Sequence, residues 1–122
     1  MTTPLEALAV FAGGGAGAVA RFAVGRAVVP LLPVVGFPWH TFAINVLGSF
    51  ALGIVAATCR DRPAWQLFLG VGICGGFTTF STFSVETLSM IERDRWLAAV
   101  GYVFGSALAG IAGAALAMKL AR

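Results

Sequence analysis

Ten consecutive residues in the second half of the chain, at 75–84, hold most of its polar chemistry: Gly-Gly-Phe-Thr-Thr-Phe-Ser-Thr-Phe-Ser. Two glycines, then β-branched threonines and hydroxyls that compete for backbone hydrogen bonds, make a weak helix. Because the surrounding stretch is apolar enough to cross a membrane, we expect a helix break at membrane depth. Broken membrane helices commonly place their freed carbonyl groups around a bound cation. A helix-packing surface of small residues is the alternative interpretation.

Aromatic rings and neutral donors beside this break could contact an anion. Phe80 and Phe83 are three residues apart, so they share one face if the helix resumes after the break. Because a phenyl ring has a positive edge, two rings presented edge-on could touch a small anion without binding it tightly. Amide and hydroxyl donors that suit a desolvated anion are offered by Asn45, Ser81, Thr82 and Ser106. The rings could equally pack in a core, and the polar groups could equally hold helices together.

Other kinds of chemistry find no support in the sequence. No Cys/His metal set, nucleophile–base pair or phosphate-binding loop occurs, which argues against an enzyme. Cys59 and Cys74 lack the spacing of a zinc or redox motif and are interpreted as small buried hydrophobes. The net charge of +3 comes from Lys and Arg residues near the ends of apolar runs, where they act as interfacial anchors. We therefore expect no nucleic-acid partner.

The elements that must position the polar residues are long and apolar. Hydrophobic residues make up 59% of the 122 residues and charged residues 11%, against about 25% charged in ordinary soluble domains. A membrane span needs about 20 mostly apolar residues. Four runs qualify, at 5–29, 39–58, 65–91 and 96–118, and Trp39, Trp65 and Trp96 mark the starts of the last three. The sequence predicts an all-α, multi-pass membrane protein with one domain, residues 1–122, four transmembrane helices and a break within the third.

The connections between these runs are short. The first is predicted to be a rigid extended turn because it contains Pro30, Pro33, Gly36 and Pro38. Charged segments at 60–63 and 92–95 form the other two. The first run has no basic segment before it and three further runs after it, so we expect a membrane span and not a cleaved signal peptide.

Basic residues are divided almost evenly between the two predicted membrane faces. An even number of spans places both termini on one face, which carries Arg60, Arg62, Lys119 and Arg122, whereas the other carries Arg26, Arg93 and Arg95. Most membrane proteins show a clear excess of Lys and Arg on the cytoplasmic face. The count therefore does not choose an orientation, and one interpretation is a chain that inserts both ways and pairs with an inverted copy. The alternative is that one charge, or the translocation machinery, fixes a single orientation.

Small residues recur at helix-packing spacing in the first and fourth runs. In lipid, such stripes allow backbones to approach closely. They favour tight helix contacts and a homo-oligomer, and they consist of Gly13 and Gly17 in the first run and of Gly101, Gly105, Ala109 and Gly113 in the fourth.

Three segments together resemble the Fluc (CrcB) family of fluoride channels. They are residues 13–22 (Gly-Gly-Gly-Ala-Gly-Ala-Val-Ala-Arg-Phe), residues 45–50 (Asn-Val-Leu-Gly-Ser-Phe) and residues 75–84, on the first, second and third runs in the family's order. The resemblance covers essentially the whole chain. It implies an antiparallel, dual-topology homodimer of four-helix subunits with two fluoride pores, in a bacterial inner membrane.

The resemblance also implies roles for individual residues. Backbone carbonyls of Gly75 and Thr78 from each subunit would hold a structural sodium ion at the dimer centre. Phe80 and Phe83 match the aromatic pair that faces fluoride, and Asn45 matches the pore asparagine. Arg21 is expected to have a structural or electrostatic role. A polar track and its neighbours fall on Thr41, Ser81, Thr82, Glu86, Tyr102 and Ser106.

Three positions depart from the family pattern. Phe22 stands where tyrosine is common, His40 where glycine is usual, and Gly110 where some members have a serine of the polar track. The last departure weakens the expectation for the far end of the track. His40 is interpreted as an interfacial side chain, with pH-dependent gating as the alternative.

Passive, fluoride-selective conduction is thus the favoured function, and it has two rivals. A small proton-coupled multidrug exporter is also a four-helix dimer, but it needs a membrane-embedded carboxylate on its first helix. The first run offers only Glu6, near its end, and Glu86 lies in the third run. A structural subunit without transport would leave the donor cluster unexplained.

Overall fold

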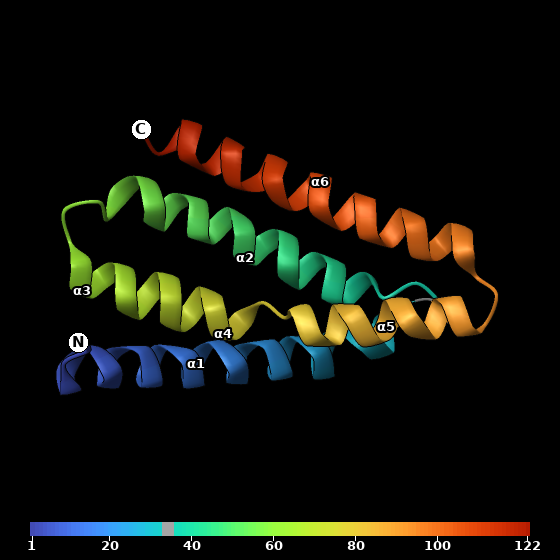
Figure 1. The fold of residues 1–122 in the computed structure, drawn as a ribbon, viewed down its shortest axis with the longest axis horizontal. Coiled ribbons are helices and arrows are strands. Elements are labelled where there is room, and N and C mark those ends of the chain that lie inside the picture. Colours follow the sequence, from blue (N-terminus) through green and yellow to red (C-terminus); the bar gives the residue numbers. More distant parts are fainter. Residues whose placement is uncertain (33–35) are drawn as a thin grey trace.

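The computed structural model describes residues 1–32 and 36–122, and four long helices dominate them (Figure 1). Each is apolar enough to cross a membrane: Pro4–Leu31, Trp39–Thr58, Pro63–Glu92 and Trp96–Leu120, with mean hydropathy between 1.4 and 1.7. These bounds lie within two residues of the runs predicted from composition. The four predicted spans are therefore confirmed as helices, and both termini lie at the same end of the bundle (Figure 1).

The first span consists of α1 (Pro4–Val28) and the 3-10 turn η1 (Val29–Leu31). The hydroxyl of Thr3 and the carboxylate of Glu6 cap α1 by bonding each other's backbone N–H groups. The prediction of an extended turn is wrong at Pro30, which lies inside η1, where its fixed φ fits a helical turn. Pro33 lies outside the described residues. Gly36 has a positive φ of 54°, which glycine adopts without strain.

The third span changes its backbone along its length. It begins as α3 (Pro63–Trp65), widens into the π-helix η2 (Gln66–Cys74) and ends its first half as α4 (Gly75–Phe77). Thr78 and Thr79 then have extended backbone, with ψ of 161° and 119°. Helix resumes as α5 (Phe80–Glu92), whose first turn is capped by the Thr79 hydroxyl, which accepts from the Thr82 N–H at 3.2 Å. The two helical halves of this span are thus joined by two extended residues.

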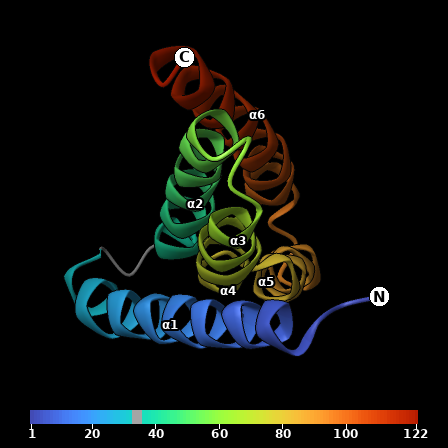
Figure 2. The same cartoon turned by 90° about the vertical axis from the view of Figure 1, so that its left-hand side faces the viewer.

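The helix α1 lies directly against the first half of the third span, which it crosses obliquely (Figure 2). A Cβ atom added to Gly13 would come within 2.3 Å of the Phe68 carbonyl oxygen, and one added to Gly17 within 2.2 Å of the Ile73 carbonyl oxygen. The predicted small-residue stripe of the first run therefore provides backbone-to-backbone contact.

The remaining spans, α2 (Trp39–Thr58) and α6 (Trp96–Leu120), pack along each other. Gly53 lies against the backbone of Ala114, and Gly110 and Gly113 face Ser49 and Val46. Gly101 and Gly105 have open space around them in the single chain. The small-residue stripe of the fourth run thus packs on α2 only in the second half of α6. Most large apolar side chains point outward, as in a membrane-embedded bundle.

Candidate functional site

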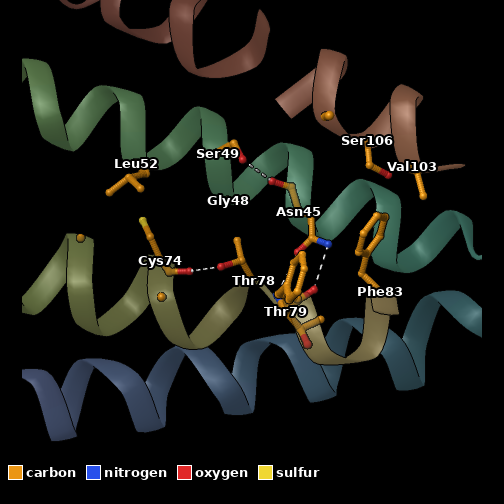
Figure 3. A pocket seen from close by; sticks show the side chains of 14 residues that line it. Asn45, Gly48, Ser49, Leu52, Cys74, Thr78, Thr79, Phe83, Val103 and Ser106 are labelled. Carbon is orange, nitrogen blue, oxygen red and sulfur yellow. Dashed lines mark hydrogen bonds between the residues drawn. The ribbon is translucent and has the colours of Figure 1, made fainter. Parts of the chain in front are cut away.

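A pocket of about 500 Å³ lies where the third span is interrupted (Figure 3). Its walls come from α2, both halves of the third span and α6. Its lining is mostly apolar, with a few polar groups around the two extended residues. Of the residues singled out from the sequence, it brings together Asn45, Gly75, Thr78, Phe80, Phe83 and Ser106.

The amide of Asn45 reaches across from α2 to the extended segment. Its Oδ1 accepts a hydrogen bond from the backbone N–H of Thr79 at 2.8 Å, and its Nδ2 donates to the Thr79 carbonyl oxygen at 3.1 Å. Figure 3 shows the side chain pointing at the break. One Nδ2–H group of Asn45 remains beyond these two bonds, because the amide carries two donors.

Aromatic rings line one side of the pocket. The Phe80 and Phe83 ring centroids lie 5.8 Å apart with their planes inclined at 38°. Phe83 also packs on Tyr102, at 4.9 Å between centroids, so it is half-buried. Phe80, by contrast, is 79% exposed in the single chain. The two rings therefore share a face of α5, but only Phe83 is enclosed by its own subunit.

A second polar group lies next to Phe83, around the carboxylate of Glu86. The Thr41 hydroxyl donates to Glu86 Oε1 at 2.7 Å, and the Tyr102 hydroxyl donates to Oε2 at 2.8 Å. Both donors are buried, with Thr41 1% and Tyr102 0% exposed. His40 Nε2 lies 3.3 Å from the Thr41 hydroxyl oxygen. The hydroxyl protons of Thr41 and Tyr102 are thus both donated to Glu86.

The Ser106 hydroxyl on α6 differs from the other polar groups. It is buried and has no hydrogen-bond partner within the described chain. It lines the same pocket as Phe83, and Figure 3 shows the two side chains near each other. Ser81 is exposed and lies outside this lining, and its hydroxyl is 3.4 Å from that of Thr79. Ser106 is therefore an available donor in a site where most donors are already used.

Two backbone carbonyl groups at the break are also without partners. Within the described residues no hydrogen bond is found to the carbonyl oxygen of Gly75 or Thr78. The neighbouring Gly76 carbonyl oxygen accepts from Arg21 Nε at 3.2 Å. Arg21 therefore supports the first half of the third span from α1.

A second pocket, of about 670 Å³, lies on the α1 side of the break. Thr79 lines both pockets, and no carboxylate lines the second among the residues that the structure describes. Its polar and basic lining includes Arg21, Arg26, His40, Thr41, Thr79 and Thr82. The break thus separates two hollows, one of them markedly basic.

Sequence reasoning missed the positions that shape the break. Thr79 caps α5 and pairs with Asn45, yet it was only one of several threonines in the 75–84 segment. Gly48 admits the Thr78 side chain, because an added Cβ would lie 2.2 Å from Thr78 Cγ2. The spacing of Asn45 and Gly48, three residues apart on one helix face, was the available signal.

The fold and the site define a small multi-pass membrane protein with a polar pocket inside its spans, the class that includes channels and transporters. Residues 8–118 match the family described as CrcB-like protein, Camphor Resistance (CrcB). The "Fluoride-specific ion channel FluC" of Novosphingobium aromaticivorans is 45% identical over 114 residues, 90% of each chain. That of Methylobacterium nodulans is 43% identical over 122 residues, 97% of each chain. This chain belongs to the CrcB-like family.

Proposed function

We propose that this chain is a fluoride-selective channel that lets fluoride cross the membrane passively. The observation that carries the proposal is the buried, unpartnered Ser106 hydroxyl in the pocket that also holds Phe80 and Phe83. An unpartnered donor in such a place normally costs free energy, and a bound ion would offset that cost. The names of the relatives, all fluoride-specific ion channels, support fluoride as that ligand.

The chemistry of the pocket suits a small, strongly hydrated anion. A selectivity filter must replace the hydration shell of its ion while binding weakly enough for release. The Ser106 O–H, the remaining N–H of Asn45 and the positive edges of two phenyl rings can do so without a fixed positive charge. Arg21 and Arg26 line the pocket on the other side of the break, where they would attract anions toward it.

The working unit in this proposal is a pair of inverted copies in a bacterial inner membrane, with two pores. Phe80 and Gly75 are exposed in the single chain, although they belong to the most polar part of a membrane span, so a second copy would complete the site. The third-span break would then lie at mid-membrane depth, where exposed backbone requires cover.

The carbonyl groups of Gly75 and Thr78 fit a structural sodium ion at the centre of the pair. Both oxygens lack partners within the described chain, and unwound carbonyls are typical ligands of Na⁺ in membrane proteins. A bound cation would add a favourable field for a nearby anion. In this proposal the chain's own contribution is to hold the two carbonyls unpaired beside the pore.

Fluoride efflux from liposomes that contain the purified protein tests the proposal, with chloride-loaded liposomes as the selectivity control. Fluoride release down its gradient without chloride release is expected, and protein that releases no fluoride would refute it. A proton-coupled exporter gains no support from Glu6, which is only partly buried and caps α1. Glu6→Gln should therefore leave fluoride efflux intact, whereas an exporter that depends on this carboxylate would lose transport.

A further inference from the structure

The backbone N–H and C=O groups of Thr79 take no part in the helical hydrogen bonds found among the described residues of the third span. Its φ of −150° and ψ of 119° are extended, between α4 and α5. The residue that caps a helix usually offers its carbonyl to the first intrahelical bond, but no backbone hydrogen bond to the Thr79 carbonyl is found in the described chain. In a membrane span water does not satisfy such groups, so both its N–H and its C=O need protein partners.

Asn45 satisfies both backbone groups of Thr79 at once. Its Oδ1 accepts from the Thr79 N–H at 2.8 Å and its Nδ2 donates to the Thr79 carbonyl oxygen at 3.1 Å. A planar carboxamide is the short side chain that carries an acceptor and a donor side by side, so it matches an extended peptide as a neighbouring strand would. Aspartate keeps only the acceptor when ionised, and serine is too short to present both.

The helix that carries Asn45, α2, also packs closely against Thr78, the residue before Thr79. Gly48 follows three residues later on the same face of α2, and its missing side chain leaves the space that Thr78 Cγ2 occupies. From α1, Arg21 bonds the Gly76 carbonyl oxygen at 3.2 Å. The break is therefore held from two helices, and within the described residues only α2 contacts the two extended residues through a paired hydrogen bond.

We propose that Asn45 is a positioning residue whose amide fixes the backbone of Thr79. It thereby fixes the start of α5 and the direction of the Thr78 carbonyl, which shares a peptide group with the Thr79 N–H. Phe80 and Phe83 lie in the first turn of α5, so the placement of both rings depends on this pairing. The expected effect of Asn45 on flux rests on the proposed fluoride conduction, whereas the pairing of Asn45 with Thr79 does not. Asn45 then offers an ion only its remaining Nδ2–H group.

Hydrogen exchange of the Thr79 amide in the reconstituted full chain tests the pairing directly. Asn45→Leu removes both partners, and loss of one hydrogen bond of about 1–3 kcal/mol corresponds to about 5- to 150-fold faster exchange. Asn45→Asp keeps an acceptor for the Thr79 N–H, so the amide should stay protected although fluoride flux falls because of the added negative charge. Protection at Thr79 and loss of flux are thus separated in this variant.

Two controls tell pairing from general loosening of the fold. Ser49→Ala removes a 2.7 Å bond to the Asn45 backbone carbonyl but leaves the amide, so Thr79 should stay protected. The Cys59 amide, bonded to the Val55 carbonyl at 2.9 Å at the far end of α2, should exchange slowly in every variant. If Asn45→Leu does not fold, Asn45→Gln, which moves the amide outward by one methylene, should show the same faster exchange at Thr79.

Unchanged Thr79 exchange in Asn45→Leu or Asn45→Gln would overturn the positioning role. Loss of flux in these variants with a protected Thr79 amide would make Asn45 an ion ligand only, and would overturn it too. A wild-type protein that conducts no fluoride would refute the proposed function, while the exchange result would still decide the pairing.

Discussion

A polar side chain in this bundle can donate a hydrogen bond to an ion only if its proton is not already donated to another protein atom. The hydroxyls of Thr41 and Tyr102 donate to Glu86, and that of Thr87 donates to the Phe83 carbonyl oxygen of its own helix. Ser106 has no such partner among the residues that the structure describes. The family resemblance places Thr41, Tyr102 and Ser106 in one polar track, whereas the hydrogen bonds separate structural groups from available ones.

Ser106 is therefore the serine whose loss should matter most for flux. Ser106→Ala removes a donor to a charged ligand, worth about 1.5–3 kcal/mol, so fluoride efflux should fall by roughly 10- to 150-fold. The matched control is Ser84→Ala, because the Ser84 hydroxyl already donates to the Phe80 carbonyl oxygen at 2.9 Å. Efflux from liposomes measures both. Equal effects of the two substitutions would contradict a pore role for Ser106.

The two phenyl rings should be needed for their edges and not for their bulk. Phe80→Ile and Phe83→Ile keep an apolar side chain but remove the positive ring edge, so efflux should fall by about 2- to 10-fold or more. Phe11→Ile is the control, since Phe11 is also 79% exposed but lies on α1 outside the pockets described above. Size-exclusion chromatography should show unchanged assembly. Normal flux in both pore variants would remove the rings from the mechanism.

At the scale of elements, hydropathy and small-residue spacing predicted what depends on local composition. The four spans begin and end where apolar runs meet charges, prolines and tryptophans, so their bounds could be predicted. The wide turns of η2 and the pairing of Thr79 with Asn45 could not, because they depend on contacts with α1 and α2. Sequence alone likewise did not show that Thr41 and Tyr102 meet on Glu86.

The contact of α1 with the third span yields a stability prediction. An alanine Cβ at Gly17 would lie 2.2 Å from the Ile73 carbonyl oxygen, so Gly17→Ala must push the two backbones apart. We expect a loss of about 1–3 kcal/mol in the free energy of unfolding.

Gly15→Ala is the matched control for this contact. No atom of the described residues lies within 4 Å of the added Cβ, and alanine favours a helix by about 0.5–1 kcal/mol over glycine. Thermal unfolding in detergent should therefore separate the two variants, Gly17→Ala melting lower and Gly15→Ala no lower than wild type. A reversed order would mean that α1 does not pack on the third span through Gly17.

At the scale of the whole molecule, the single chain leaves its most polar region uncovered. Both termini lie at one end (Figure 1), so the basic residues divide between the two faces as four against three. The pocket at the break is bordered by Phe80, which is mostly exposed, and by Gly75, which is also exposed. A pair of inverted copies would cover this region and would explain why neither face carries a clear excess of charge.

Orientation should therefore respond to small changes in charge. Thr2→Lys with Ala64→Lys raises the count of basic residues on the face of the termini from four to six, and that face should become cytoplasmic. Leu31→Lys with Glu92→Lys raises the count on the other face from three to five and should invert the chain. Reporter fusions at the C-terminus measure orientation in cells.

Each variant alone then lacks an inverted partner, so fluoride export should fail, whereas co-expression should restore it. Export by either variant alone, in a single confirmed orientation, would show that the working assembly does not need inverted copies.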